Sequence, residues 1–278
     1  MIFNLNMNFS NLIDNLDGVN IKKIKGGNAP NMVPDYCEAV VETDDISALE
    51  EILETSKYDL ELVQENGKLM IQSFGKSAHG STPAKGQNAI SQLISFLNSI
   101  KKPDDDINSF IDWYDQHIGM EYYGESIGCG FEDKVSGKLI FNVGMIEMNR
   151  NQVKLTVNIR YPVTFNEKEI IKGIQSKIKD TEIVFEETQH IGPLHVLKED
   201  ELVKKLMEVY KNITGEKAEP IAIGGGTYAR ALEKAVAFGP QFPGTPEVAH
   251  QKDEYISIDD LIEAAKIYAN AILKLASE

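Results

Sequence analysis

Two histidines of this chain occupy segments in which an imidazole could do chemistry. His250 lies in PEVAHQKDEYIS, just before a helix expected to begin at Ser257. A histidine in a loop at the edge of an α/β sheet is well placed to act as a metal ligand or a base, although a hydrogen-bonded surface histidine would look the same in sequence. His79 lies in GKSAHGSTP among small residues. This setting fits a donor to an oxyanion or a substrate carboxylate, and equally a turn or capping residue.

Other polar positions could bind an anion. Arg160 in NIRYP ends an expected strand, and its planar guanidinium suits a carboxylate of a substrate or of a neighbouring side chain. Asn31 in NMVP is a loop amide that could do similar work, although an asparagine before a strand commonly shapes a turn. In GGGTYAR, Gly225 and Gly226 would let backbone N–H groups approach an anionic ligand closely. A tight structural turn explains these glycines equally well.

Several function classes are disfavoured by motif and charge. The glycine run is not followed by Gly-Lys-Ser/Thr and lacks the Gly-x-Gly-x-x-Gly spacing, so nucleotide binding there is a weak hypothesis. No Gly-x-Ser-x-Gly nucleophile elbow is present. The formal net charge of -15 repels phosphate backbones and anionic lipid. We therefore expect neither a nucleic-acid partner nor a membrane partner.

The compartment expected from the sequence is the cytoplasm. The 278 residues include 2 cysteines, too few for a disulfide framework. No apolar stretch of about 18 residues exists, so nothing is expected to span a membrane. The first residues lack the basic start and long apolar run of a signal peptide.

The first part of the chain has the pattern of an α+β domain. Alternating apolar residues predict a strand at the start of the chain, and Asp44 or Asp45 can cap a helix over 47–56. Asn66-Gly67 predicts a hairpin turn because both positions tolerate positive φ. Further strands and a helix are expected at 36–42, 60–65, 68–74 and, for the helix, 89–100. The charged segment 101–106 is expected to be a linker or an exposed turn.

A second unit of similar composition follows. Residues 138–146 and 152–161 are expected to form a hairpin. Thr164 and Glu167 have the spacing of a capping box for a helix to about residue 178, and 182–189 is expected to be a strand. Two strand/helix units predict a two-layered α+β domain over residues 22–190, ferredoxin-like in character, with residues 1–21 as its opening strand.

The last residues follow a helix–strand rhythm that is typical of α/β proteins with parallel strands. Helices are expected at 202–213, 227–233 and 257–275, and strands at 218–223 and 235–238. A parallel sheet needs several strands with both faces covered, and only two are visible here. Residues 191–278 are therefore expected to be the C-terminal part of an α/β domain.

Six segments together resemble a known enzyme family. They are GGNAPNMVP, FGKSAHGSTPAKGQNA, DKVSGKLIFNVGMI, NIRYPV, IGGGTYAR and VAFGPQFPGTPEVAHQKDEYISIDDLIEAAKIYANAI, in this order. The chain resembles the lid and C-terminal part of PepV-like dipeptidases, which belong to the zinc exopeptidase superfamily with carnosinases and aminoacylases. The resemblance covers nearly the whole chain. It implies an α/β catalytic domain with two zinc ions (or manganese), an α+β lid, and dipeptide hydrolysis by a zinc-activated water.

The resemblance also implies roles for individual residues. His250 corresponds to the last zinc ligand of the family, and His79 to the lid histidine that stabilises the tetrahedral oxyanion. Asn31 and Arg160 correspond to lid groups that bind the C-terminal carboxylate of the dipeptide. Gly225 and Gly226 correspond to a loop that lines the same pocket.

The departure from the family pattern is as informative as the match. The family takes its other metal ligands from an N-terminal half that includes a His-x-Asp site, and none of the 5 histidines here is followed two residues later by Asp. One histidine does not make a catalytic zinc site, which needs about three protein ligands. We therefore expect a truncated dipeptidase that is inactive alone. The alternative is a non-catalytic peptide-binding or assembly module, and in either case exposed apolar faces of residues 198–278 favour self-association.

Overall fold

The computed structural model describes the chain except for residues 13–17, 101–103, 218, 247, 249–252 and 278. The described residues form two compact units, Met1–Pro193 and Leu194–Glu278. In the described part of the chain, no helix combines the length and the apolar composition that crossing a bilayer requires.

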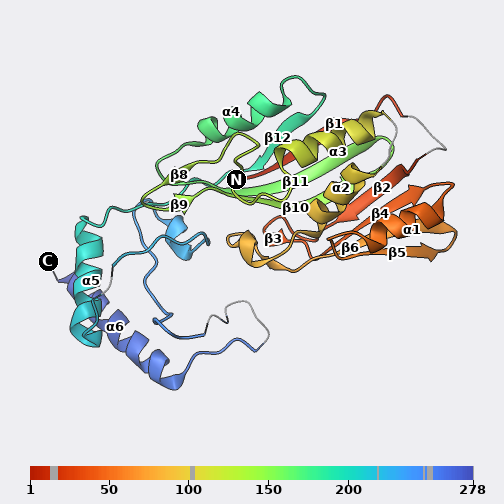
Figure 1. The fold of residues 1–278 in the computed structure, drawn as a ribbon. Coiled ribbons are helices and arrows are strands. Elements are labelled where there is room, and N and C mark those ends of the chain that lie inside the picture. Colours follow the sequence, from red (N-terminus) through yellow and green to blue (C-terminus); the bar gives the residue numbers. More distant parts are fainter. Residues whose placement is uncertain (13–17, 101–103, 218, 247, 249–252, 278) are drawn as a thin grey trace. The chain divides into compact units, whose positions relative to one another are not determined.

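The first unit is built on an eight-stranded antiparallel sheet (Figure 1). The strand order across this sheet is β12-β1-β11-β10-β2-β4-β6-β5. Its strands are β1 (Ile2–Asn8), β2 (Asn20–Gly26), β4 (Tyr36–Glu42), β5 (Leu60–Glu65), β6 (Lys68–Phe74), β10 (Ile140–Met148), β11 (Gln152–Arg160) and β12 (Val184–Gln189). Two short ribbons accompany the sheet: β3 (Met32–Val33) with β7 (Ala78–His79), and β8 (Glu132–Asp133) with β9 (Gly137–Lys138).

The local signals for strands and turns are confirmed. Asn66 and Gly67 have φ of 52° and 74° and join β5 to β6, as a two-residue hairpin requires. The alternation at the start of the chain produces β1, whose buried Phe3 and Leu5 point to the core. The long-range pairing was not predictable locally, since β1 lies between β12 and β11, next to one edge of the sheet. The mixed α/β character of the unit is thus as expected, and its strands form one large sheet.

Helices cover one face of this sheet. They are α1 (Ile46–Glu54), α2 (Ala89–Ser99), α3 (Asp106–His117) and α4 (Glu167–Ile178), with a 3-10 turn η1 (Pro83–Lys85) before α2. Their buried side chains join those of alternate strand residues in a single apolar cluster. Polar contacts link neighbouring helices: the Ser91 and Tyr114 hydroxyls are 2.8 Å apart, and Trp113 Nε1 donates to the Lys177 carbonyl over 3.0 Å. None of these four helices covers the opposite face of the sheet, which is called the open face.

Two helix starts differ from the sequence expectation. The capping box of α4 is formed by Asn166 and Glu169, two residues beyond the predicted pair. Thr164 instead donates its backbone N–H and its hydroxyl to the Asp133 carboxylate, at 3.1 and 2.9 Å. Helix α3 begins inside the segment expected to be a linker, because the Asp105 side chain accepts the N–H of Asn108 and caps the helix. Both errors arise because neighbouring polar residues offer alternative caps, which the sequence does not rank.

The second unit contains two packed helices, α5 (Glu201–Thr214) and α6 (Ile258–Ala276), as predicted. Its small core consists of Leu206, Val209, Ile267 and Ala271. The rest of the α/β prediction for this part is wrong for the described residues: neither 219–223 nor 235–238 is a strand, and the expected helix is the short 3-10 turn η2 (Tyr228–Ala231). Short apolar runs become strands only where a neighbouring strand completes their hydrogen bonds, and no strand is present among the described residues of this unit.

Candidate functional site

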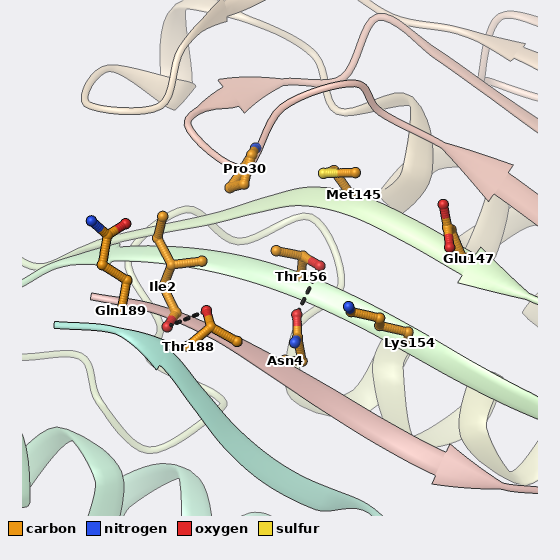
Figure 2. Close-up of a pocket in the computed structure, with 9 residues that line it drawn as sticks. All are labelled: Ile2, Asn4, Pro30, Met145, Glu147, Lys154, Thr156, Thr188 and Gln189. Carbon is orange, nitrogen blue, oxygen red and sulfur yellow. Dashed lines mark hydrogen bonds between the residues drawn. The ribbon is translucent and has the colours of Figure 1, made fainter.

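The sheet face that carries no helix is lined by polar side chains. Residues opposite each other on antiparallel strands project from the same face of a sheet. Asn142 of β10 is paired with Asn158 of β11, and Asn158 with Ile2 of β1, whereas the adjacent pair Val143 and Val157 belongs to the core. Figure 2 shows this open face, with Asn4 of β1 accepting a hydrogen bond from the Thr156 hydroxyl over 2.9 Å.

A groove of about 620 Å³ runs over the open face (Figure 2). Its floor is made by strands and one wall by the loop between β2 and β3, which brings Pro30 above Met145. The lining residues are Ile2, Asn4, Pro30, Met145, Glu147, Lys154, Thr156, Thr188 and Gln189. Six of these nine residues are polar, and Asn31, His79 and Arg160 are not among them.

The loop that carries Asn31 is held against the sheet by one side chain. Asn142 Nδ2 donates to the carbonyl oxygens of Pro30 and Met32, each over 2.9 Å. A β-bulge at Gly144 allows the close approach, since a Cβ there would lie 2.6 Å from Pro30 Cα. Asn31, between the two anchored residues, is exposed. The fold thus fixes the backbone on both sides of an accessible amide side chain.

His79 lies beside Asn31 because β7 pairs with β3. Met32 and His79 are opposite each other, and the Gly80 N–H donates to the Asn31 carbonyl over 2.7 Å. The imidazole is half-buried, and its Nδ1 accepts the Ser81 N–H at 3.3 Å and lies 2.6 Å from the Ser81 hydroxyl. Since a backbone N–H can only donate, Nδ1 is an acceptor and the neutral ring carries its proton on Nε2. His79 therefore has the tautomer of a hydrogen-bond donor through Nε2.

Arg160 lies on the same open face, at the end of β11. Its Nε donates to Asn158 Oδ1 over 3.3 Å, and Asn158 is the cross-strand partner of Asn142. The structure therefore places His79 beside Asn31, whereas Arg160 is related to them through sheet register alone: it contacts Asn158, whose cross-strand partner is Asn142. A guanidinium, an amide and an imidazole donor are the groups that recognise a carboxylate and an adjacent carbonyl oxygen.

A second polar chain adjoins Arg160. The Tyr161 hydroxyl is 2.7 Å from His190 Nε2, and the two rings stack with centroids 6.0 Å apart. His190 Nδ1 is 2.5 Å from a Glu167 carboxylate oxygen at the start of α4. Burial, together with the negative charges of Glu167 and Glu187, raises the pKa of Tyr161. These contacts tie the end of β11 to the end of β12 and to α4.

The remaining site residues of the sequence prediction lie outside the first unit or outside the described residues. Gly225 and Gly226 belong to the second unit, in the segment before η2, and a Cβ at either would meet nothing within 4 Å. His250 lies outside the described residues. Among the residues that the structure does describe, no group of three or more His, Cys, Asp or Glu side chains could hold a metal ion. The described residues therefore do not fit a zinc centre by themselves.

Solved structures share this fold. The crystal structure of an aminoacylhistidine dipeptidase from Vibrio alginolyticus superposes with a TM-score of 0.51 at 14% sequence identity, covering 100% of this chain and 61% of that chain. At this identity the likeness concerns the fold alone, which is of the kind found in that dipeptidase structure.

The chain belongs to peptidase family M20/M25/M40, whose family model matches residues 108–274. The Bacillus subtilis (strain 168) protein named "Putative dipeptidase YtjP" is 41% identical over 251 residues, covering 88% of this chain and 53% of that protein. The Staphylococcus haemolyticus (strain JCSC1435) protein named "Putative dipeptidase SH1171" is 35% identical over 260 residues, covering 91% and 55%. The resemblance to PepV-like dipeptidases is thereby confirmed, and the chain spans about half the length of these relatives.

Two residues of the site were missed by reasoning from the sequence. Asn142 and Asn158 are paired across the strands between the predicted residues. Asn158 is one polar residue in the ordinary polar/apolar alternation of β11, so nothing marks it out. The available signal was Asn142, a polar residue that interrupts the apolar run of IFNVG two residues before Gly144. Buried polar residues in such runs are hydrogen-bonded in native structures, so the residue needed a partner.

Proposed function

We propose that this chain is the lid and C-terminal part of a metal-dependent dipeptidase. The observation that supports the proposal is the anchoring of the Asn31 loop, with His79 beside it, to the strand whose cross-strand neighbour carries Arg160, in a chain whose relatives are named dipeptidases. In this proposal the first unit is the lid, and the second unit belongs to the catalytic domain. The cytoplasm is its proposed compartment.

The proposed roles follow from the chemistry of each group. Arg160 and Asn31 bind the C-terminal carboxylate of a dipeptide, the guanidinium through paired N–H donors and the amide through its NH₂ group. His79, with its proton on Nε2, donates to the carbonyl oxygen of the scissile amide as negative charge develops there. Gly225 and Gly226 offer backbone N–H groups to the same ligand. No nucleic acid or membrane takes part.

The metal of the complete enzyme is proposed to be zinc, as two ions, with manganese as an alternative. His250 is the one ligand assigned to it in this chain. A catalytic zinc needs about three protein ligands, and the chain has no His-x-Asp motif to contribute the others. The chain alone is therefore proposed to bind dipeptides without hydrolysing them.

The proposal is tested by separating binding from turnover. Calorimetry with L-alanyl-L-alanine and with its C-terminal amide should show binding of the free carboxylate form and at least about tenfold weaker binding of the amide. Hydrolysis of L-alanyl-L-alanine should be undetectable with added zinc or manganese. It should appear when the N-terminal half of the Bacillus subtilis relative is supplied. Robust hydrolysis by the chain alone would refute the inactivity, and equal binding of both peptides would refute the carboxylate site.

The second candidate is a non-catalytic peptide-binding or assembly module of the same family. It is favoured by the large apolar side chains that the second unit exposes, among them Ile221 at 85%, Ile272 at 67% and Leu273 at 65%. Exposed apolar surface of this kind marks association sites. Dipeptide binding that never becomes hydrolysis, even with the N-terminal half of the relative supplied, would favour this candidate.

A further inference from the structure

Three segments that are distant in sequence meet at the Asn142 side chain. Its Nδ2 donates to the carbonyl oxygens on both sides of Asn31, each over 2.9 Å. The turn after His79 lies against it, because a Cβ at Gly80 would be 3.2 Å from Asn142 Nδ2. Across the sheet it faces Asn158, which accepts from Arg160. Asn142 is 1% exposed, so it does not itself present a surface to a ligand.

We propose that Asn142 is a positioning residue, which holds Asn31 and His79 in the relative placement that a dipeptide ligand requires. The inference rests on the proposed function for the identity of the ligand. The geometry around Asn142 does not depend on that proposal. Asn142 acts through other residues: it fixes the backbone of Pro30 and Met32 directly, and that of His79 through the pairing of β3 with β7. A neutral amide suits this position, because a single NH₂ group donates two hydrogen bonds and can reach both carbonyls without a buried charge.

The other end of the same amide has a cost that its two donated hydrogen bonds must offset. Asn142 Oδ1 is buried and has no hydrogen-bond partner among the described residues. An unpartnered buried acceptor is a cost that an apolar side chain of similar size would avoid. Its presence in an otherwise apolar strand is explained if the two donated hydrogen bonds fix a site.

The test compares Asn142→Ala with a matched loss of a buried amide elsewhere. Asn108 in α3 is 3% exposed, donates Nδ2 to the Asp105 carboxylate over 2.7 Å and also has an unpartnered Oδ1. Asn108→Ala therefore controls for general destabilisation. Calorimetry with L-alanyl-L-alanine should show affinity reduced at least about tenfold by Asn142→Ala and changed less than about twofold by Asn108→Ala, since a misplacement near 1 Å weakens an oriented site strongly.

A second readout does not depend on the ligand. The ¹H–¹⁵N imidazole signals of His79, assigned with His79→Gln, should shift in Asn142→Ala and stay in place in Asn108→Ala. If Asn142→Ala does not fold, Gly80→Ala displaces the same loop from its other side, because a Cβ there would lie 2.8 Å from the Asn31 carbonyl oxygen and 3.2 Å from Asn142 Nδ2, and it should reproduce both effects. Unchanged His79 signals in Asn142→Ala and Gly80→Ala would overturn the positioning role, and so would unchanged affinity. If the unsubstituted chain does not bind the dipeptide, the proposed function fails, whereas the His79 signals still decide the role of Asn142.

Discussion

Replacing Gly144 by alanine tests whether the loop that carries Asn31 depends on close backbone contact. The added Cβ would lie 2.6 Å from Pro30 Cα and 2.7 Å from the Pro30 carbonyl carbon, where ordinary contact begins at 3.4 Å. The loop must therefore retreat by roughly 1 Å, or the bulge must change, at a cost of about 1–3 kcal/mol typical of overpacking. In a unit of this size that cost lowers the melting temperature by about 3–9 °C. The same displacement should weaken dipeptide binding about tenfold or more.

Urea unfolding, thermal unfolding and calorimetry measure these effects. Gly192→Ala is the matched control, because a Cβ there would meet nothing within 4 Å. It should leave the free energy of unfolding within about 0.5 kcal/mol of the unsubstituted chain, as surface substitutions do. If Gly144→Ala is as stable as the control and binds the dipeptide equally well, the close approach of Pro30 to the bulge is not what fixes the loop.

Other predictions concern thiols, pH and association. Burial raises the pKa of Cys37 and raises that of Cys129 to about 12, so Ellman's reagent at pH 8 should label neither thiol until denaturant is added. Partial burial raises the pKa of Asp133, but hydrogen bonds to its carboxylate outweigh this and lower the pKa from 3.8 to about 2. The resulting stabilisation, about 1 kcal/mol after solvent screening, is complete above pH 4 and is lost as the pH falls towards 2, so urea titrations of Asp133→Asn should lack this pH dependence. Ile272→Glu should reduce concentration-dependent self-association in sedimentation, whereas Asn270→Glu, at an exposed polar position of the same helix, should not.

Seven of the eight strands of the large sheet could be predicted one by one, but β2 was missed and the assembly was not predicted. Alternation and the Asn66-Gly67 turn act over a few residues, so they place strands and hairpins correctly. The order of strands depends instead on pairings such as Ile2 with Asn158 and Ile146 with Gly26, which join segments far apart in the chain. No local pattern specifies which strand edges pair with each other, and for that reason the placement of β1 between β12 and β11 was not derivable from residue patterns.

The site was predictable to a different degree in each unit. The segments around Asn31, His79 and Arg160 are distinctive enough to carry the resemblance, whereas Asn142 and Asn158, which link them, look like ordinary strand residues. In the second unit, runs such as the one ending at Ile223 were expected to be strands because they are apolar, yet Ile223 is 58% exposed. An apolar run of this length does not distinguish a strand from an irregular segment unless a partner strand is present.

The two units also differ in how completely their own residues account for their structure. The first unit closes a large apolar cluster between one sheet face and four helices, and it contains all three residues proposed to bind the dipeptide carboxylate. The second buries a four-residue core and leaves large apolar side chains exposed. Under the proposed function, recognition is therefore built on the unit with the self-sufficient core. The proposed hydrolytic chemistry instead depends on ligands beyond His250. Such a chain can bind a dipeptide without hydrolysing it. A preorganised carboxylate site needs only fixed hydrogen-bond donors, whereas activation of a water molecule needs a metal ion with its full set of protein ligands.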